Sequence, residues 1–150
     1  MPIKTFRGQI ADTDQDTIVL HTNDGSTGYR IVKLEIMTSE PFAGATSEHV
    51  LKVWSKAQTT PYTDFTVDFS DQILLAAAIT TNHTTGYANP IPVVIIFDNV
   101  TFNQDIYITH TDSSNSQALN YHLELEQVKL DLNQNTVATL KDIRNITAPA

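Results

Sequence analysis

Three aspartates at alternate positions form the first group of residues whose types and spacing fit a known chemistry. Asp12, Asp14 and Asp16 match the opening of a calcium-binding loop, in which alternate carboxylates point into one concavity. An EF-hand loop then requires glycine at its sixth position and glutamate at its twelfth, but these positions hold Thr17 and Asn23. An aspartate-rich hairpin turn explains the spacing with fewer assumptions, and an improvised Ca²⁺ site is the alternative.

Histidines are the side chains best suited to bind a transition metal or to transfer protons near neutral pH. The five histidines are at positions 21, 49, 83, 110 and 122. No two of them have the close spacing of a zinc motif. His110 and His122 would be neighbours if their strands pair across the loop between them, and such a pair is more often a cross-strand contact than a site. We therefore predict no metal site.

Other catalytic motifs receive no support from the sequence. Glu124 and Glu126 lie on one strand face and would resemble a glycosidase pair only if another carboxylate lay opposite, so a solvated face explains them better. There is no Gly-x-Ser-x-Gly nucleophile elbow, although a Ser-His-Asp triad can assemble from distant positions. Five glycines leave little room for a phosphate-binding loop. We expect no catalytic residues and no cofactor, and a hydrolase remains a minor alternative.

Aromatic side chains in or near the predicted loops are the remaining candidates for a binding site. They are Phe42, Trp54, Tyr62, Tyr87 and Phe102. Such residues can anchor a protein partner or stack on a sugar ring. The alternative is that they close the ends of the folded domain.

Composition narrows the function classes further. Hydrophobic residues make up 41% and charged residues 17% of the 150-residue chain, and the formal net charge is −8. This charge opposes binding to nucleic-acid phosphates, which requires clustered Lys and Arg. Arg7, Arg30 and Arg144 are the only arginines and are far apart in the sequence. Polarity comes instead from Thr, Asn, Ser and Gln, and β-branched threonine favours strands. We expect a β protein without a nucleic-acid partner.

Membrane insertion and export are not indicated. The longest apolar run, residues 91–97, has the length of a strand and falls short of the roughly 18 residues that cross a bilayer. The first residues lack the apolar stretch of a signal peptide, so we expect the Asn-x-Thr sequons at Asn82, Asn99 and Asn145 to stay unglycosylated. Without cysteine, packing must hold the core of this soluble chain.

Hydrophobic periodicity predicts an antiparallel, jelly-roll-like β-sandwich of about eight strands with one short C-terminal helix. The segments that favour strands are residues 4–10, 17–22, 29–38, 49–56, 64–70, 73–80, 93–97, 105–111 and 119–130. The helix is expected over residues 136–145, capped by Asn133 or Asn135. Neither a repeat nor a linker interrupts the chain, so we expect residues 1–150 to form a single domain.

Several finer features follow from the same pattern. Residues 64–70 alternate most clearly, with the aromatic side chains of Phe65 and Phe69 expected to face inward. Residues 93–97 are continuously apolar and predict a central strand covered on both faces. A change of parity in strand 119–130 predicts a β-bulge near Gln127. Residues 4–10 and 17–22 are expected to form a first hairpin, and residues 105–111 and 119–130 a last pair.

Three segments carry a resemblance to a known class of proteins. Residues 22–33, 102–110 and 135–144 resemble small β-sandwich structural proteins of tailed marine phages. The resemblance implies a virion component, namely a decoration or accessory protein of the capsid surface, which would be made in the host cytoplasm and would commonly be oligomeric. Its implied partners are the major capsid protein or other virion proteins. The alternative is a carbohydrate- or receptor-binding module of a virion, since β-sandwiches display loops for that purpose.

Overall fold

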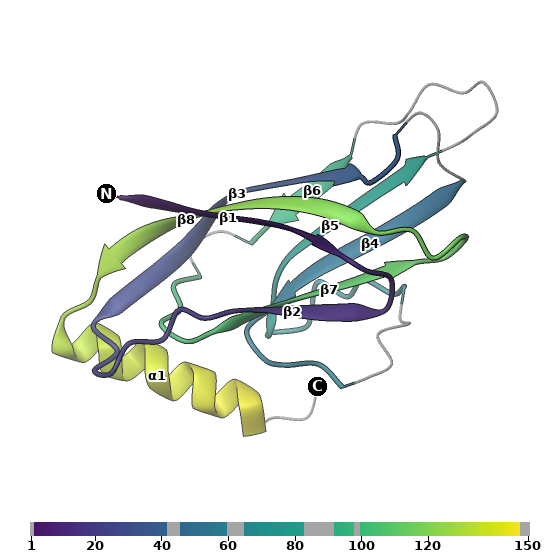
Figure 1. Ribbon diagram of the computed structural model, residues 1–150. Coiled ribbons are helices and arrows are strands. Elements are labelled where there is room, and N and C mark those ends of the chain that lie inside the picture. The colour runs from purple at the N-terminus through teal and green to yellow at the C-terminus, as the bar shows by residue number, and fades with distance from the viewer. Residues whose placement is uncertain (1, 42–45, 60–64, 83–91, 98–99, 148–150) are drawn as a thin grey trace.

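Two antiparallel sheets and one C-terminal helix make up the computed structural model, which describes residues 2–41, 46–59, 65–82, 92–97 and 100–147 (Figure 1). The elements are β1 (Ile3–Ile10), β2 (Asp14–Ile18), β3 (Thr27–Thr38), β4 (Ser47–Trp54), β5 (Leu74–Asn82), β6 (Val93–Ile96), β7 (Ile106–Asp112), β8 (Leu119–Lys129) and α1 (Leu132–Thr147). One sheet has the order β1-β8-β3 and the other the order β2-β7-β4-β5-β6. The predicted fold class, a mainly β protein with two antiparallel sheets and one short helix, is confirmed.

The core lies between the two sheets, because each strand there presents alternate residues to the other sheet. Leu123 and Leu125 of β8 face inward from the three-stranded sheet, while Leu51 of β4 and Ile108 of β7 face inward from the five-stranded sheet, and all four are fully buried. Burying a side chain of this size contributes about 2 kcal/mol. This alternation leaves the odd residues of β1 and the even residues of β8 on the outer face of their sheet.

The aspartate-rich segment contains a turn at Asp12 and the start of a strand at Asp14, and it does not connect a hairpin. The chain turns at residues 11–13, where Thr13 has a φ of 54°, and β2 begins at Asp14. β1 pairs with β8, whereas β2 pairs with β7, so the two consecutive strands belong to different sheets. The expected first hairpin is therefore wrong, and so is the expected pairing of residues 105–111 with 119–130, since β7 and β8 also lie in different sheets.

Tyr121 of β8 joins the two sheets near the turn between β1 and β2. Its ring packs over Gly8, its direct neighbour on β1, and its hydroxyl donates to Asp16 Oδ2 on β2 at 3.0 Å. Burial raises the pKa of the Tyr121 hydroxyl, and the Asp16 charge and hydrogen bond raise it further. Tyr121 therefore stays neutral and donates its proton to the carboxylate throughout the physiological range.

Gly8→Ala is expected to lower the free energy of unfolding by about 1–3 kcal/mol, the range for overpacking a filled site. A Cβ at this position would lie 2.9 Å from the Tyr121 hydroxyl oxygen and 3.1 and 3.2 Å from two ring carbons, so the buried ring must shift. Urea unfolding measures the change, with Thr5→Ala, at an exposed position of the same strand, as the control. Equal stability of the two variants would contradict the packing described.

The segment with the clearest alternation does not form a strand in its described part. Residues 65–68 have no strand pairing, and Phe65 and Phe69 are exposed. Only Val67 packs inward, onto a second hydrophobic cluster built around Trp54 on the outer face of the five-stranded sheet. The expectation of a strand with both aromatic rings buried was wrong. The segment lies on the outside of the sheet, where Val67 packs against it, and does not pair as one of its strands.

The run of apolar residues at 93–97 is likewise placed differently from the prediction. β6 is the edge of the five-stranded sheet and pairs only with β5. Its side chains alternate between exposed and partly buried, with Val94 and Ile96 packed against the core. The expected central strand is therefore an edge strand with an apolar outer face. β5 itself confirms the strand predicted over residues 73–80.

Two predictions of detail also require correction. The register between β3 and β8 shifts between Ile31 and Lys33, so the irregularity lies in β3 rather than near Gln127. The helix begins at Leu132, because Asp131 Oδ1 accepts from the Gln134 amide at 2.8 Å and Gln134 Oε1 accepts from the Asp131 amide at 3.1 Å. This reciprocal capping box starts the helix four residues before the expected position.

Helix α1 covers one end of the sandwich (Figure 1). Asn103, which is fully buried, attaches it by donating from Nδ2 to Thr139 Oγ1 at 3.0 Å and to the Gly25 carbonyl at 3.1 Å. Among the residues described, no helix combines the length and the apolar character needed to cross a bilayer.

Candidate functional site

The outer face of the three-stranded sheet carries a row of polar side chains that continues across all three strands. Arg7 of β1, His122 of β8 and Glu35 of β3 are direct neighbours in the strand register. They face outward because the intervening residues of β8, such as Leu123, fill the core. The row therefore brings a guanidinium, an imidazole and a carboxylate together from positions far apart in the sequence.

A concavity of about 580 Å³ opens along this row. Its lining combines the row with neighbouring residues of the same strands: Arg7, Gly8, Glu35, Ile36, Met37, Asn120, Tyr121 and His122. The volume is sufficient for a small molecule or for a side chain of a partner.

Charged neighbours extend the row along β3 and β8. Lys33 Nζ lies 3.3 Å from Glu35 Oε1 and 3.8 Å from Glu124 Oε2. His122 Nε2 lies 3.3 Å from Glu124 Oε2. Glu126, in contrast, pairs with Arg30 Nη2 at 3.0 Å. Cationic side chains lie opposite both glutamates of β8, as expected for a solvated face. The carboxylate nearest to Glu124 is that of Glu35, with one oxygen of each within 4.8 Å of the other.

A second exposed feature lies on the outer face of the five-stranded sheet, at its β6 edge. Ile79 of β5 and Val93 of β6 are direct cross-strand neighbours, and Ile95 follows two residues later on the same face. Their exposed fractions are 45%, 53% and 41%. Phe69 lies beside the end of β6, where its ring meets the Phe97 ring edge-on with centroids 5.0 Å apart. We call Ile79, Val93 and Ile95 the apolar edge.

A chain of buried polar side chains runs between β4 and β7. Ser47 Oγ lies 2.9 Å from His49 Nε2, His49 Nδ1 lies 2.8 Å from His110 Nε2, and His110 Nδ1 lies 3.0 Å from the Ala11 carbonyl oxygen. Because the carbonyl accepts only, His110 donates from Nδ1, and its Nε2 accepts from His49 Nδ1. His49 Nε2 then accepts from the Ser47 hydroxyl. Two neutral rings satisfy every bond of this chain.

Burial keeps both imidazoles neutral. It lowers the pKa of His49 to about 4, with a further contribution from the neighbouring His110, and it lowers the pKa of His110 although the Ala11 carbonyl and nearby carboxylates oppose the shift. A serine hydroxyl beside an imidazole is also the arrangement of an activated nucleophile. Ser47 is fully buried, however, so no substrate atom can approach its Oγ. These hydrogen-bonded side chains form a structural network in the core.

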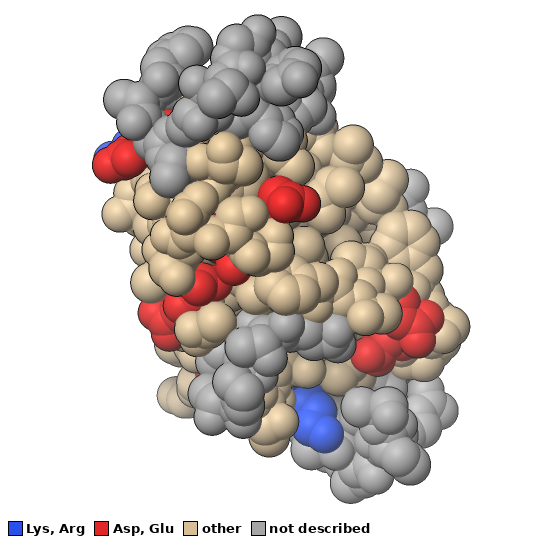
Figure 2. Space-filling model, turned by 90° about the vertical axis from the view of Figure 1, so that its right-hand side faces the viewer, with Lys and Arg blue, Asp and Glu red and all other residues tan. Residues whose placement is uncertain are grey.

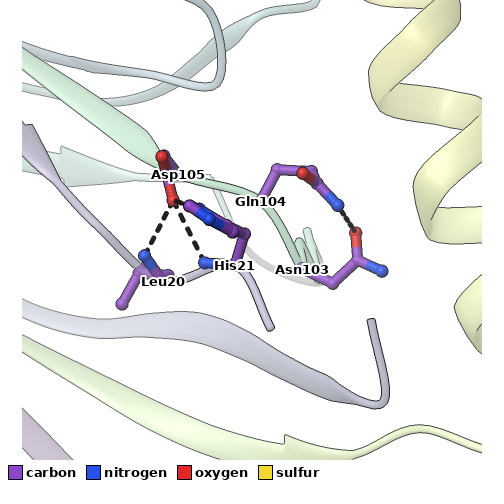
Figure 3. Close-up of polar contacts among 5 residues, drawn as sticks. All are labelled: Leu20, His21, Asn103, Gln104 and Asp105. Atoms are coloured by element: carbon purple, nitrogen blue, oxygen red, sulfur yellow. Dashed lines mark hydrogen bonds and ion pairs between the residues drawn. The ribbon is translucent and has the colours of Figure 1, made fainter. Parts of the chain in front are cut away.

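His21 and Asp105 form a hydrogen-bonded pair near the surface (Figure 3). Asp105 Oδ1 accepts from His21 Nδ1 at 2.7 Å and from the backbone amides of Leu20 and His21 at 2.9 and 3.1 Å. Burial raises the pKa of the Asp105 carboxyl, but these hydrogen bonds and the imidazole outweigh burial and lower it. The pair attaches the segment after β2 to the segment before β7. In the latter segment Gln104 Nε2 also donates to Asn103 Oδ1 at 3.4 Å (Figure 3).

Two of the five aromatic binding candidates, Trp54 and Phe102, lie within the described residues. Trp54 is buried, with Nε1 donating to Thr109 Oγ1 at 2.8 Å and with Lys52 Nζ 5.4 Å from the ring centroid. Phe102 is also buried, and its backbone pairs with Tyr29. Phe102 packs in the core between the sheets and Trp54 packs in the second hydrophobic cluster, so neither ring is an exposed anchor. The other three candidates, Phe42, Tyr62 and Tyr87, lie outside the described residues, as does His83.

The three aspartates of the calcium-like pattern bond to separate partners. Asp12 Oδ1 accepts from the Asp112 amide at 2.7 Å, Asp14 Oδ1 from the Gln15 amide at 2.8 Å, and Asp16 from Tyr121. The first of them lies in the turn and the other two in β2. Asp12 thus joins the turn to β7 and Asp16 joins β2 to β8, whereas the Asp14 bond is local to β2.

Charged side chains are sparse on the described part of one face of the molecule (Figure 2). In Figure 2 the described surface of one face is largely uncharged, with separate acidic groups and little basic surface. Together with the net charge of −8, this face offers no stripe of positive charge that could follow a nucleic-acid backbone.

Sequence reasoning did not detect the cluster of Glu35, His122 and Glu124, because it arises from the register between β3 and β8 rather than from spacing along the chain. The parity of the two strands was the available signal: both segments were predicted, but not as a pair.

Comparisons with protein-family models, with curated proteins and with solved structures found no match for the chain.

Proposed function

We propose that this protein is a structural component of a virion, an accessory or decoration protein that attaches to the capsid surface through protein contacts. The observation that carries the proposal is the apolar edge. Ile79 of β5 and Val93 and Ile95 of the edge strand β6 form a contiguous group of half-exposed side chains. Natural sheets usually place charge or proline at such an edge to prevent association. An exposed apolar group of this kind marks a surface that another protein covers.

The chemistry of the apolar edge also describes its partner. The described strand Val93–Ile96 contains only valine and isoleucine, so it offers no charge to a partner. A complementary surface must therefore be apolar and uncharged at its centre, as in the cores of protein interfaces. Covering the three side chains would contribute on the order of 1 kcal/mol each. The major capsid protein is the partner that we assign to this surface, and repeated copies on a lattice would multiply a modest affinity.

Two further observations support the same class. Residues 22–33, 102–110 and 135–144 resemble structural proteins of tailed phages. The polar clusters of the described residues are internally paired: Lys33 with two glutamates, Arg30 with Glu126, and the buried histidines with each other. Such pairing stabilises a scaffold and leaves the apolar edge available for docking.

The test of this function uses purified particles and the purified protein. Mass spectrometry of gradient-purified particles should detect the chain, and wild-type protein should co-sediment saturably with particles that lack it. Ile95→Lys is expected to weaken co-sedimentation about tenfold or more, because docking would bury an unpaired ammonium group. Val19→Lys is the matched control, since Val19 is exposed and follows β2 at the opposite edge of the same sheet.

Two outcomes would contradict the proposal. One is the absence of the chain from purified particles, and the other is equal binding by the Ile95 and Val19 variants. Retention on immobilised glycans instead of on particles would favour the carbohydrate-binding alternative, for which Phe65 and Phe69 are the exposed aromatic side chains of the described segment 65–73.

A further inference from the structure

We propose that Glu35, His122 and Glu124 form a binding site for a divalent transition-metal ion, with Zn²⁺ as the preferred ion. One ligand atom of each residue lies within 4.8 Å of the other two. The site is on the three-stranded sheet, whereas the apolar edge is on the five-stranded sheet, so this inference does not depend on the proposed virion role.

Strand register fixes the relative positions of the three ligands. Glu35 is the direct neighbour of His122 across the β3–β8 pair, and Glu124 is two residues further along β8 on the same face. Direct cross-strand neighbours have Cβ atoms about 5 Å apart, and residues two apart on one strand are about 7 Å apart. Backbone hydrogen bonds of a central strand therefore hold the three side chains in one triangle, which a flexible loop would not do.

Only a small movement of side chains is needed to bring the three ligand atoms to the distances of a zinc site. Zinc bonds of about 2.1 Å in tetrahedral geometry place ligand atoms roughly 3.4 Å apart. His122 Nε2 and Glu124 Oε2 are already 3.3 Å apart. The side chains of Glu35 and His122 are 59% and 39% exposed, so rotation about their χ angles can bring the third ligand atom inward without disturbing the core.

The donor set selects the class of ion. One imidazole nitrogen and two carboxylate oxygens suit Zn²⁺ and similar borderline ions, whereas Ca²⁺ and Mg²⁺ prefer sites made of oxygen alone. Three protein ligands leave a fourth position open. The concavity of about 580 Å³, lined by Glu35 and His122, adjoins the triangle and has room for a water molecule or for a carboxylate of a partner in that position.

The position of Lys33 shows that the Glu35 and Glu124 carboxylates attract a cation. Lys33 also limits the affinity of the site for a metal ion. Its ammonium group contacts both carboxylates, at 3.3 and 3.8 Å, and thus occupies part of the space that a metal ion would take. Arg7, the neighbour of His122 on β1, adds a second positive charge. A metal ion must displace the ammonium group, so we expect micromolar rather than nanomolar binding, and we expect Lys33 to control it.

Titration calorimetry with ZnCl₂ on protein without an affinity tag tests the site. The wild-type chain should bind one ion, His122→Ala should weaken binding at least tenfold, and Lys33→Gln should strengthen it severalfold because the competing ammonium group is removed. His21→Ala is the control for the other exposed histidine that pairs with a carboxylate, and it should bind like the wild type. CaCl₂ should give no saturable heat.

Spectroscopy provides a second readout that does not depend on heat. Co²⁺ in place of Zn²⁺ should give visible absorption bands that disappear in Glu124→Gln. All substituted side chains are at least partly exposed, so circular dichroism should show the fold of the wild type. The proposal is overturned if Zn²⁺ does not bind at millimolar concentration, if His122→Ala binds like the wild type, or if His21→Ala alone abolishes binding.

Discussion

Asp112→Ala should lower the free energy of unfolding by about 3 kcal/mol or more, a loss large enough to unfold much of a marginally stable domain. The Asp112 carboxylate is buried and accepts from the backbone amides of Glu48 at 3.0 Å, Ser114 at 3.0 Å and Gln117 at 2.7 Å. Hydrogen bonds to a charged group contribute about 1.5–3 kcal/mol each, and rehydration of the freed amides recovers part of the loss. Alanine removes all three acceptor contacts at once.

Asp112→Asn is the matched control. Its remaining oxygen can accept from Glu48 and Ser114, as Oδ1 does, and only the Gln117 contact of Oδ2 is replaced by a donor. We expect this variant to lie between the wild type and Asp112→Ala in urea unfolding at pH 7. If both variants are as stable as the wild type, the carboxylate does not hold the β7–β8 connection as described.

Acidification from pH 7 to pH 5 is expected to destabilise the protein by about 2 kcal/mol through His49 alone, and by more when His110 is included. The pKa of His49 in the fold is about 4, below the usual value of 6.5 that the unfolded chain regains. Between these values the unfolded state binds more protons than the folded state. Stability is therefore full above the unfolded pKa, is lost as the pH falls toward 4, and changes no further from this group below that pH.

The charged groups nearest the histidine pair oppose this effect only partly. Asp12 and Asp112 lie close enough to favour protonation of the rings, but burial outweighs them. Carboxyl groups contribute at lower pH, since hydrogen bonds lower the pKa of the Asp112 carboxyl despite its burial. Their stabilising effect is lost below pH 4, whereas the histidine effect lies between pH 6.5 and 4.

Urea unfolding at pH 7.5, 6 and 5 separates the two contributions. His49→Gln should be less stable than the wild type at pH 7.5 but should lose less stability on acidification, because one of the two buried imidazoles is gone. Thr5→Ala, which changes no titratable group at an exposed position, should keep the pH dependence of the wild type. Identical pH dependence of all three proteins would show that the buried pair does not titrate on unfolding.

The sequence was most informative where a strand has one wet face and one buried face. β3 and β8 were located closely because Leu34 and Leu123 alternate with charged neighbours, and the fold class followed from such segments. It was least informative where two environments produce one pattern. A continuous apolar run fits both a central strand and an edge strand that a partner covers, so β6 was misplaced. Alternation at Phe65 fits a strand and also a segment lying on a sheet.

The candidate sites depended on pairings that no local pattern encodes. His49 and His110 meet because β4 pairs with β7, and their strands are separated by two others in the sequence. The Glu35, His122 and Glu124 triangle needs the register of β3 against β8, which is further changed by the irregularity between Ile31 and Lys33. Periodicity identifies which face of a strand a residue occupies, but not which strand lies beside it.

The change of sheet between β1 and β2 affects how the chain acquires its structure during synthesis. Ile3 pairs with Glu126, and Asp14 pairs with His110, so neither N-terminal strand has a partner until most of the chain exists. Closing such long loops costs entropy before any contact forms, and folds dominated by distant pairings form slowly. β8 is the strand that joins β1 to β3, so the three-stranded sheet cannot assemble before β8 has been made. A nascent chain that ends before Leu119 therefore cannot form this sheet at all.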